Sequence, residues 1–447
     1  MTDAPALPHD GKKLKLCVLG LGYIGLPTAS MFAVSGHTVV GVDPSPRVRE
    51  ALGAGRPHIE EPDLDTLVSA AVLSGRLRVQ SDIEQADVFI IAVPTPFTAA
   101  TKTADLRHVV QAADAIRPHL RPGNLVILES TVPPGTTRDI LAPILAGAGL
   151  VPGRDVHVAH CPERVLPGRI LLELVSNDRL AGGLTPTCAR RAADLYASFV
   201  QGQILQTDAT TAEMVKVMEN TYRDVNIALA NEFALIAEGV GVDAWEAIRL
   251  ANRHPRVSIL SPGPGVGGHC IAVDPWFLVQ AAPEAARLIR LAREVNDDMP
   301  KRVLDHLTRL ARPPARIAQL GVTYKANVDD VRESPAVEFA RLAVAKGYDV
   351  RICDPHAAKN TDALPAPLCS LLDAARNAEA IVVLVDHAEF RTIDPDIVGS
   401  AVSRKQLLDA KSCVDHEAWR ASGFEIHGLG DGRHCGCHIL NPPARPE

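Results

Sequence analysis

Hydrophobic and polar residues alternate along the first half of this chain in blocks that predict strands and helices in succession. Stretches with a helical pattern separate short apolar runs that end at glycine, proline or acidic residues. The apolar runs predict strands at 14–20, 38–43, 77–80, 88–94, 124–129 and 156–160. This succession is typical of a parallel sheet covered by helices on both faces, so we predict a first doubly wound domain over residues 1–206.

A long uninterrupted helical stretch follows this first domain. Nothing breaks a helix over 210–238, and Gly239 follows as a stop signal. Thr210 and Glu213 have the spacing of an N-terminal capping box. At about 1.5 Å per residue such a helix exceeds ~40 Å, which is long enough to link two domains. We therefore predict a central helical domain over residues 207–312 that carries this connecting helix.

The alternation of strands and helices resumes after Pro313-Pro314. Further strands are predicted at 316–322, 349–354, 380–386, 406–409 and 424–427. We predict a second Rossmann-like domain over residues 313–447, which makes the fold class α/β with two Rossmann-type doubly wound domains joined by a long central helix. The second domain lacks a complete G-x-G-x-x-G, so its ligand need not be a dinucleotide.

A glycine motif that follows the first predicted strand indicates a dinucleotide site. Gly20, Gly22 and Gly25 form G-x-G-x-x-G between a strand and a helix, where phosphates can meet free backbone N–H groups. Asp43 ends the second strand at the distance expected of the acid that holds a ribose 2′-hydroxyl. An acid at this place repels a 2′-phosphate, so NAD is the favoured cofactor, while Arg47 nearby leaves NADP open.

Composition narrows the classes of partner. The 447 residues carry a net charge of −7, which offers no broad basic surface for nucleic acid. No apolar run approaches the length of a membrane span and the N-terminus lacks the apolar core of a signal peptide, so we expect a cytoplasmic protein with no membrane partner. Nine scattered cysteines fit reduced thiols better than disulfides. The tail from His434 to His438 matches no familiar zinc pattern, and we predict no metal.

One cysteine lies in a setting that favours covalent chemistry. Cys270 is inside the glycine-rich stretch 261–277, beside His269 and four residues before Asp274. Glycines let the backbone approach a ligand, and a neighbouring cation favours the thiolate, which is the nucleophilic form. The alternative is an inert cysteine buried in a tight loop. The density of glycine and polar neighbours favours the nucleophile.

The long helix carries a polar face. Lys216, Asn220, Arg223 and Asn231 fall at similar azimuths because they are separated by about one, two or four helical turns. Such a stripe can simply face water. Beside a nucleotide site, a lysine and an asparagine can instead stabilise an oxyanion, and we favour this interpretation.

Several separated motifs in this order resemble the UDP-glucose/GDP-mannose dehydrogenase family over essentially the whole chain. The glycine motif, the polar helix face and the cysteine loop are three of them. The motifs span Gly20 to Gly25, Ser130 to Gly135, Cys161 to Gly168, Lys216 to Asn220, Gly267 to Asp274, and Arg332 to Pro335. Within the family, the sequences around Glu163, Asn220 and His254 are similar to those of the branch that oxidises UDP-N-acetyl-D-mannosamine.

The resemblance implies a reaction and a catalytic set. Two NAD⁺ accept two hydrides as the C6 alcohol of a UDP-sugar becomes a carboxylate, and Cys270 holds the intermediate aldehyde as a thiohemiacetal and then as a thioester. Lys216 and Asn220 are expected to stabilise the alkoxide. Glu163 is expected to activate the hydrolytic water with help from Thr131 and Asp274.

The resemblance also implies two sets of binding residues. Those expected at the cofactor are Gly20, Gly22, Tyr23, Ile24, Gly25, Asp43, Arg47, Thr95, Thr131 and Arg332. Those expected at the UDP-sugar are Glu163, Arg164, Val165, Lys216, Asn220, Arg223, Arg256, Gly267, Tyr324 and Lys325. Local alternatives are a helix N-cap for Asp274, a turn cap for Glu163 and a backbone contact for the Thr131 hydroxyl.

Some functional alternatives stay open at the level of sequence. UDP-N-acetylglucosamine and UDP-glucose remain possible substrates, since a few pocket contacts decide among sugars. A two-electron hydroxyacid-type dehydrogenase and a non-catalytic nucleotide-sugar binding protein are the alternatives of other classes, and neither requires Cys270. The long helix further suggests a homodimer or a higher homo-oligomer packed along it.

Overall fold

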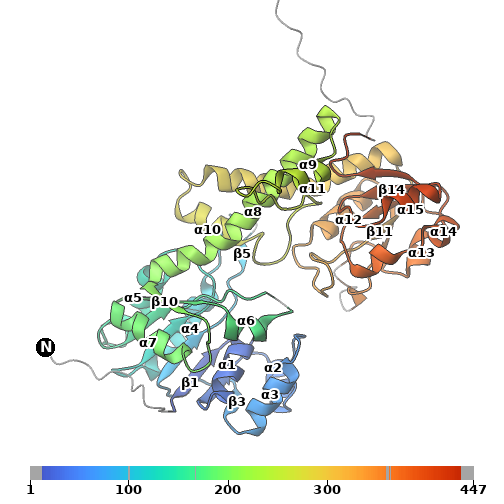
Figure 1. The fold of residues 1–447 in the computed structure, drawn as a ribbon. Helices are drawn as coiled ribbons and strands as arrows, with labels where there is room; N and C mark the ends of the chain where they lie inside the picture. Colours follow the sequence, from blue (N-terminus) through green and yellow to red (C-terminus); the bar gives the residue numbers. More distant parts are fainter. Residues whose placement is uncertain (1–12, 99–100, 167, 359–361, 363, 434–447) are drawn as a thin grey trace, which may run out of the picture. The chain divides into compact units, whose positions relative to one another are not determined.

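The computed structural model describes residues 13–98, 101–166, 168–358, 362 and 364–433 (Figure 1). The chain divides into two compact units. The first contains the described residues up to Glu219 together with Trp276–Pro283, and the second contains Asn220–Pro275 and the described residues from Glu284 onward. No helix among the described residues is long and apolar enough to cross a membrane.

The first unit is built on an eight-stranded sheet. Its order is β10-β9-β8-β7-β4-β1-β2-β3, and all neighbouring strands are parallel except β8 and β9, which are antiparallel. The strands are β1 (Lys15–Leu19), β2 (Thr38–Val42), β3 (Leu77–Gln80), β4 (Val88–Ile91), β7 (Leu125–Leu128), β8 (His157–His160), β9 (Arg179–Gly183) and β10 (Ile204–Asp208).

Both faces of this sheet are buried. In β1, Leu16 and Val18 belong to one hydrophobic cluster, while Cys17 and Leu19 belong to another. Successive side chains of a strand point to opposite faces, so the two clusters lie on opposite sides of the sheet. The helices are α1 (Gly25–Val34), α2 (Pro46–Gly53), α3 (Leu64–Leu73), α4 (Arg107–Ile116), α5 (Ala142–Ala146), α6 (Ile170–Ser176) and α7 (Pro186–Tyr196).

Two strands at one edge of the sheet escaped the sequence pattern. One of them, β9, ends in Gly182 and Gly183, and glycine weakens a strand pattern. Here their missing side chains are needed for packing. A Cβ on Gly182 would lie 2.5 Å from the Cβ of Ala212, and one on Gly183 would lie 2.2 Å from the backbone nitrogen of Ala189. The helices therefore approach β9 closely only because it ends in glycine.

The predicted long helix is α8 (Ala209–Val240), with 32 residues, which runs from the first unit into the second. The predicted capping box at its start is wrong. Asp208 caps the helix by accepting hydrogen bonds from the backbone N–H and the hydroxyl of Thr211. Glu213 is instead buried and accepts hydrogen bonds from the N–H groups of Gly135 and Thr137. The start of α8 is thereby tied to the turn that follows Thr131.

The second unit contains a five-stranded parallel sheet of order β12-β11-β13-β14-β15. Its strands are β11 (Arg316–Leu320), β12 (Asp349–Cys353), β13 (Ala380–Val383), β14 (Gln406–Asp409) and β15 (Glu425–Gly428). Ile317 faces one hydrophobic cluster, and Ala318 and Leu320 face another. The predicted fold class, two doubly wound sheets joined by a long helix, is confirmed.

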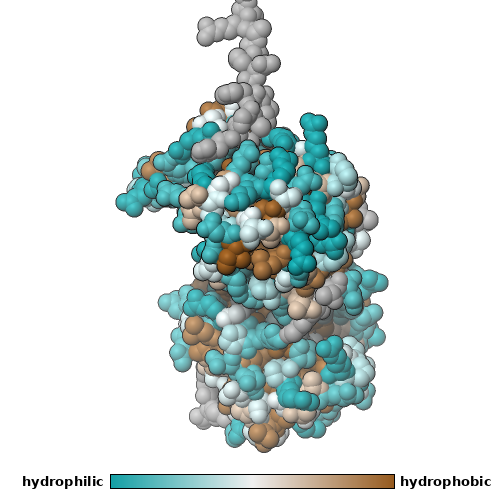
Figure 2. Space-filling model, turned by 90° about the vertical axis from the view of Figure 1, so that its right-hand side faces the viewer, coloured by the Kyte–Doolittle hydropathy of each residue, from teal (hydrophilic) through white to brown (hydrophobic). Residues whose placement is uncertain are grey.

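Helices of several lengths accompany this sheet. They are α9 (Ala244–Ala251), α11 (Arg287–Leu310), α12 (Pro335–Ala345), α13 (Leu371–Ala375), α14 (Pro395–Gly399) and α15 (His416–Ala421). A further helix, α10 (Asp274–Ala281), begins in the second unit and ends in the first. On the face shown in Figure 2, hydrophilic residues predominate and hydrophobic residues form small groups between them.

Candidate active site

The glycine turn between β1 and α1 has the geometry of a phosphate-binding turn. Gly20 has φ +87°, and a Cβ on it would lie 2.6 Å from the carbonyl oxygen of Ala92. A Cβ on Gly25 would lie 1.9 Å from the carbonyl oxygen of Gly20. A Cβ on Gly22 would meet nothing within 4 Å. Two glycines therefore serve packing, and the middle one leaves open space beside the turn that a pyrophosphate can enter.

Asp43 extends this turn toward a ribose. Its carboxylate accepts hydrogen bonds from the N–H groups of Leu21 and Ser45, at 3.1 and 2.9 Å. These bonds hold the acid beside the glycine turn, while Arg47 is exposed in the first turn of α2. Open space at Gly22 and a fixed carboxylate at Asp43 fit NAD. Tyr23 and Ile24 are half-buried in the same turn.

Thr95 and Thr131 come from the ends of neighbouring strands, β4 and β7. The Thr95 hydroxyl donates to the carbonyl oxygen of Thr131 at 2.7 Å. Ser130 makes a matching bond to the carbonyl oxygen of Val93, also at 2.7 Å. Because β4 and β7 are parallel neighbours, these residues meet at the carboxyl edge of the sheet, which is where open α/β sheets bind ligands.

Glu163 lies at the same edge in a buried cluster of charges. Its Oε2 accepts from Nη1 of Arg179 at 2.8 Å, and its Oε1 accepts from the N–H of Arg164 at 2.8 Å. Nη2 of Arg179 donates to Glu129 at 2.5 Å. Burial raises the pKa of the Glu129 carboxyl to about 7, against the opposing effect of Arg179. A candidate base is thus held by an arginine that it shares with a second carboxylate.

The segment after Glu163 is fixed by acids from elsewhere in the first unit. The Arg164 guanidinium donates to Glu219 at 2.6 Å and to the carbonyl oxygen of Asp178 at 2.5 Å. Glu61 accepts from the N–H groups of Gly168 and Ile170 at 2.8 and 2.7 Å. The bonds of Arg164 and those of Glu61 together hold the loop around half-buried Val165. The substrate contact expected of the Arg164 side chain stays a prediction, since that side chain is engaged within the protein.

Lys216 lies on α8 close to a buried histidine of β8. Burial lowers the pKa of His160 to about 3, and the positive charge of Lys216 contributes to that shift. His160 is therefore neutral at pH 7, and its two ring nitrogens have no hydrogen-bond partner among the described residues. Lys216 itself is half-buried. It supplies a cation near the carboxyl end of β8.

One turn further along α8, in the second unit, Asn220 joins two other predicted residues. Its side-chain nitrogen donates to Oδ2 of Asp274 at 2.5 Å, and its side-chain oxygen accepts from the guanidinium of Arg223. Asn220 and Asp274 are both buried. Asp274 is the first residue of α10, so its position agrees with the local alternative of a helix start while its carboxylate binds Asn220.

Cys270 is exposed in the glycine-rich loop, and its sulfur lies 3.2 Å from Nδ1 of His269. Desolvation by the surrounding protein, and to a smaller degree the charge of Arg332, lower the pKa of His269 although part of its ring is exposed. The neutral form of His269 is therefore favoured at pH 7, and a neutral imidazole can accept the thiol proton or donate to the thiolate. The exposed thiol excludes the alternative of a cysteine buried in a tight loop.

The loop is held against the connection between β11 and α12. A Cβ on Gly267 would lie 2.6 Å from the carbonyl oxygen of Glu333, and one on Gly268 would lie 2.8 Å from the ring of Tyr324. Gly268 also has φ +80°. Larger residues at these two positions would push Cys270 away from Tyr324. The structure thus brings Gly267, Tyr324 and the cysteine loop together, and their contact with a UDP-sugar stays a prediction.

Asn231 anchors the start of the loop. It is buried on α8, where its side-chain oxygen accepts from the N–H of Gly263 at 2.8 Å and its nitrogen donates to Asn296 at 2.9 Å. The side-chain nitrogen of Asn296 in turn donates to the carboxylate of Asp224 at 2.8 Å. Because the side chain is satisfied inside the second unit, the alternative of a water-facing stripe does not hold at Asn231, while the favoured oxyanion role of the stripe stays a prediction.

The remaining predicted cations are exposed. Arg332 forms an ion pair with Asp330 at 2.6 Å, and Lys325 is exposed one residue after Tyr324. Arg256 lies near its neighbour His254, at 3.4 Å between ring and guanidinium nitrogens. Arg332 belongs to the second unit and the glycine turn to the first, so a cofactor contact by Arg332 stays a prediction.

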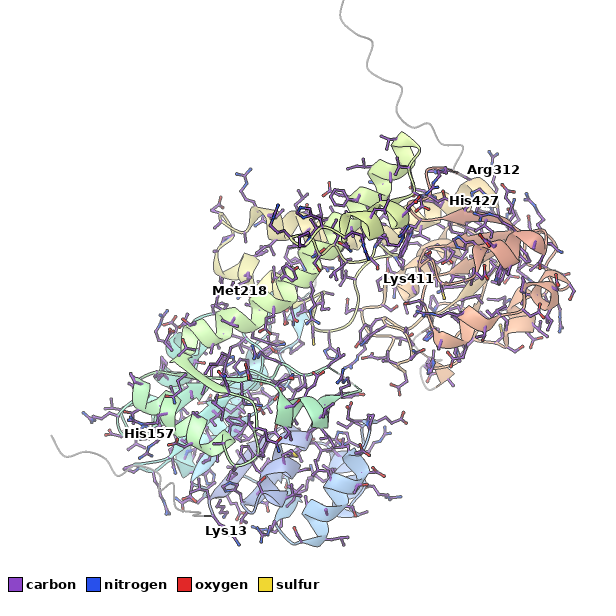
Figure 3. The ribbon with its side chains drawn as sticks, viewed as in Figure 1. Lys13, His157, Met218, Arg312, Lys411 and His427 are labelled. Atoms are coloured by element: carbon purple, nitrogen blue, oxygen red, sulfur yellow. The ribbon has the colours of Figure 1, made fainter. Side chains whose placement is uncertain are left out.

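One cation at the cysteine loop had drawn no role from the sequence. Lys411 follows β14 (Figure 3), and a Cβ on Gly263 would lie 3.3 Å from the Lys411 side chain. Its ammonium nitrogen lies 3.8 Å from Asp386. A partly buried cation therefore lies beside the start of the loop that carries Cys270.

One group of possible metal ligands among the described residues is already committed to other bonds. The ligand atoms of His356, His387 and Glu389 lie within 4.8 Å of one another. Nδ1 of His387 accepts from the N–H of Asn327, so Nε2 carries the proton and faces Asp354 at 3.1 Å. A metal would have to displace one of these bonds. The cysteine and histidine tail at 434–438 lies outside the described residues.

Besides Lys411, sequence reasoning missed three site residues: Glu61, Glu129 and Arg179. The signal for Glu129 was its place directly after the buried strand β7, where an acid meets the carboxyl edge. Arg179 opens β9, which the pattern did not predict. Glu61 acts through backbone contacts more than 100 positions away in sequence, and no local pattern reports such a contact.

Three sequence profiles match consecutive parts of the chain. They describe the NAD binding domain, the central domain and the UDP binding domain of the UDP-glucose/GDP-mannose dehydrogenase family, at residues 14–200, 210–298 and 318–416.

Individual relatives match over most of their length. A UDP-N-acetyl-D-mannosamine dehydrogenase of Methanocaldococcus jannaschii is 49% identical over 430 residues, covering 95% of this chain and 98% of that protein. An NDP-N-acetyl-D-galactosaminuronic acid dehydrogenase of Ralstonia nicotianae is 50% identical over 406 residues, covering 87% and 94%. A solved structure of a UDP-D-ManNAc dehydrogenase from Pyrococcus horikoshii is 43% identical with a TM-score of 0.87, covering 94% of this chain and 100% of that one.

Proposed function

Because the chain belongs to the UDP-glucose/GDP-mannose dehydrogenase family, we propose that it oxidises UDP-N-acetyl-D-mannosamine to UDP-N-acetyl-D-mannosaminuronate with two NAD⁺. The observation that carries the four-electron reaction is Cys270, an exposed thiol in a glycine-rich loop with His269 at its sulfur. A two-electron dehydrogenase or a binding protein has no use for such a nucleophile.

The choice of sugar rests on the named relatives. Relatives that are 45–49% identical are UDP-N-acetyl-D-mannosamine dehydrogenases. The galactosaminuronate dehydrogenase is as similar, so an N-acetylgalactosamine-type substrate is the second candidate. UDP-N-acetylglucosamine and UDP-glucose are further alternatives. The 2-acetamido group common to the first two candidates predicts that the pocket recognises an N-acetyl group.

The first half of the reaction produces an aldehyde and captures it. NAD⁺, bound at the glycine turn and Asp43, supplies the hydride acceptor for both oxidations. A water ordered near Lys216 or Asp274 takes the proton of the C6 hydroxyl. Cys270 then adds to the aldehyde, and Lys216 and Asn220 stabilise the alkoxide of the thiohemiacetal. Capture prevents the aldehyde from hydrating and diffusing away.

The second half releases the acid. Loss of the second hydride converts the thiohemiacetal into a thioester on Cys270. Glu163 acts as the base that takes a proton from water, with Thr131 and Asp274 orienting that water. Water adds to the thioester carbon, the carbon–sulfur bond breaks, and the products are the carboxylate and the Cys270 thiol.

The proposed division of labour follows three domains. We assign NAD binding to residues 1–206, the connecting helix and cysteine loop to 207–312, and UDP binding to 313–447. Tyr324, Lys325 and Gly267 support the UDP assignment because the cysteine loop packs on the first turn after β11 in the second unit. There the helix α12 begins at Pro335, and helix starts favour phosphate.

We further infer a homodimer and a cytoplasmic location. The part of α8 in the second unit exposes five large apolar side chains, from Tyr222 to Val240, which is unusual for a face that stays in water. Among the described residues Arg256 hydrogen-bonds only to its neighbour His254, so in such a dimer its guanidinium can reach the sugar nucleotide of a second copy. Seven described cysteines are free, which suits a reducing compartment.

The deciding experiment counts NADH formed per sugar consumed. Purified protein is incubated without oxygen with NAD⁺ and limiting UDP-N-acetylmannosamine, and in parallel with the N-acetylgalactosamine, N-acetylglucosamine and glucose analogues. Two NADH per sugar and a uronate product are expected with the first. One NADH per sugar would contradict the covalent four-electron reaction, and a preference for another sugar would replace the proposed substrate.

A further inference from the structure

Three charged residues meet at one edge of the sheet in the first unit. Glu129 directly follows β7, and Glu163 comes three residues after the end of β8. Arg179 opens β9, which runs antiparallel to β8 with Ala159 paired to Gly183 and His160 to Gly182. Continuing that register places Arg179 opposite Glu163. The antiparallel turn of β9 therefore delivers an arginine to the edge where the candidate base lies.

The guanidinium bridges the two carboxylates. Nη1 of Arg179 lies 2.8 Å from Oε2 of Glu163, and Nη2 lies 2.5 Å from Oε1 of Glu129. All three side chains are at most 9% exposed. The two terminal nitrogens of Arg179 each bind a different carboxylate. Because the guanidinium is rigid, its contact with Glu129 at Nη2 also sets the position of Nη1, which orients Glu163.

The surroundings of Glu129 are closed on every side described. Tyr196 of α7 and Thr28 of α1 donate to Oε1 at 3.1 and 3.4 Å, and the Arg179 guanidinium lies 3.8 Å above the Tyr196 ring. The Cys161 thiol also faces the cluster, and burial raises its pKa to about 12, so it stays neutral. Oε2 of Glu129 is buried and has no hydrogen-bond partner among the described residues.

We propose that Arg179 and Glu129 are positioning residues for the hydrolysis step, in which Arg179 orients Glu163 and Glu129 offsets the charge of Arg179 so that Glu163 can take a proton from water. This inference rests on the proposed function and assigns roles to two residues that otherwise form a buried ion pair. Arg179 alone would hold Glu163 well but would oppose protonation of its carboxylate. A second carboxylate on the same guanidinium removes that opposition.

The charge of Glu129 changes within the working range of an enzyme. Burial, with the nearby charge of Glu163 adding to it, raises the pKa of Glu129 to about 7 against the pull of Arg179. Below that pH Glu129 is neutral, and the whole charge of Arg179 acts on Glu163. Above it the charge is shared. Hydrolysis of the thioester is therefore expected to accelerate as pH rises through about 7.

The test follows decay of the acyl adduct on Cys270 in the full-length protein. Wild type and Glu129→Gln are mixed with NAD⁺ and the UDP-sugar that the stoichiometry assay identifies, quenched at intervals, and examined by intact mass between pH 6 and 8. Glu129→Gln keeps the size and an acceptor oxygen but removes the charge.

We expect the adduct of Glu129→Gln to decay about tenfold more slowly at pH 8 than that of the wild type. This loss is a part of the roughly 10²–10⁴-fold that a positioned base contributes. The rise in decay rate near pH 7 should be absent in the variant. The first hydride transfer should be unchanged.

Two more variants separate positioning from folding. Glu129→Asp retains the charge and should restore the pH profile, and Arg179→Lys should slow adduct decay because an ammonium cannot hold two acids in a fixed fork. Arg191→Lys is the matched control, since Arg191 is also buried and donates to the carbonyl oxygen of Gly123 outside the cluster. NAD binding measured for each variant reports whether the first unit is folded.

The outcomes divide clearly. A slower, pH-flattened decay in Glu129→Gln with recovery in Glu129→Asp supports the inference. The same pH profile in Glu129→Gln and wild type overturns it, as does equal slowing in Arg191→Lys. If Glu129→Gln does not fold, Glu129→Asp and Arg179→Lys still decide it by the same criteria. A wild type that forms no adduct and yields fewer than two NADH overturns the proposed function, and the inference with it.

Discussion

At the scale of residues, the cysteine loop places a thiol, a neutral imidazole and a buried carboxylate in one short stretch. The Cys270 sulfur lies 3.2 Å from Nδ1 of His269. Asp274, four residues after the cysteine, accepts a hydrogen bond from the side chain of Asn220. The loop therefore presents the nucleophile to solvent and keeps the acid inside. This separation suits a thiol that must reach a substrate carbon while the carboxylate orders water and side chains nearby.

Replacing Cys270 by serine should abolish conversion to the acid while leaving NAD binding intact. A serine hydroxyl is a much weaker nucleophile at pH 7, so an aldehyde formed by the first hydride transfer is not captured. We expect at most one NADH per sugar and no adduct at residue 270, measured by absorbance at limiting substrate and by intact mass. Cys413→Ser in the second unit is the control. Uronate formation at the wild-type rate by Cys270→Ser would contradict covalent catalysis.

At the residue scale, sequence predicts which side chains lie close together where they are also close along the chain. The glycine turn and Asp43 follow strands directly, and Cys270 with Asp274 lies in one short loop, so local spacing reports their proximity. Asn220 meets Asp274 across 54 positions, and Arg179 meets Glu129 across 50. Sequence alone suggested Asn220 by residue type and by family resemblance. It gave no reason to link Arg179 with Glu129.

At the scale of elements, the long helix acts as a frame for the cysteine loop. Asn231 projects from α8 to the N–H of Gly263, and the same side chain binds Asn296 of α11. One amide thus fixes the loop, α8 and α11 to one another within the second unit. The sequence pattern placed Asn231 on a polar stripe with Lys216, Asn220 and Arg223. It could not tell a face turned to water from one turned to another helix.

Asn231→Leu should lower stability and loosen the loop together. The apolar side chain fills the space but leaves the Gly263 N–H and the Asn296 oxygen unpaired, at a cost of about 2–6 kcal/mol for two buried groups. We expect a lower midpoint in denaturant and slower thioester formation on Cys270. Asn252→Leu is the matched control. Asn252 also makes two bonds to a loop, through Ile259, but it is exposed, so water can replace them and the expected cost is about 1 kcal/mol or less. Equal losses in the two variants would refute the anchoring role.

Central strands of the two sheets were easier to predict from sequence than the strands at one edge of the first sheet. Six strands of the first sheet and all five of the second were predicted, because strands buried on both faces are continuous apolar runs. The two strands of the first sheet that were missed, β9 and β10, lie at one edge of that sheet, and β9 ends in glycines needed for close packing. The same edge carries Arg179. A functional contact was therefore hidden where the strand pattern was weakest.

At the scale of the whole molecule, the proposed homodimer rests on the exposed apolar face of α8. In the second unit, Tyr222, Leu229, Phe233, Ile236 and Val240 are each 37–61% exposed and recur every three, four or seven residues. That spacing places them on one stripe of the helix. A stripe on a helix can pack on the same stripe of a second copy around a two-fold axis, so that each side chain is used by both partners.

Phe233→Glu should convert the proposed dimer into a monomer. A charge in the middle of the stripe would be desolvated and would face its own copy across the two-fold axis, which opposes association by several kcal/mol. We expect light scattering coupled to size exclusion to give twice the chain mass for wild type and the chain mass for the variant. Glu232→Gln, one residue away and outside the stripe, is the control.

If Arg256 serves the partner's substrate, the monomer should also lose uronate formation. Arg256→Ala and Cys270→Ser should each be inactive alone, and mixing them should restore part of the activity, because a hybrid dimer contains one site with both residues. A wild type that is monomeric at all concentrations would contradict the assembly and leave Arg256 to act within its own chain.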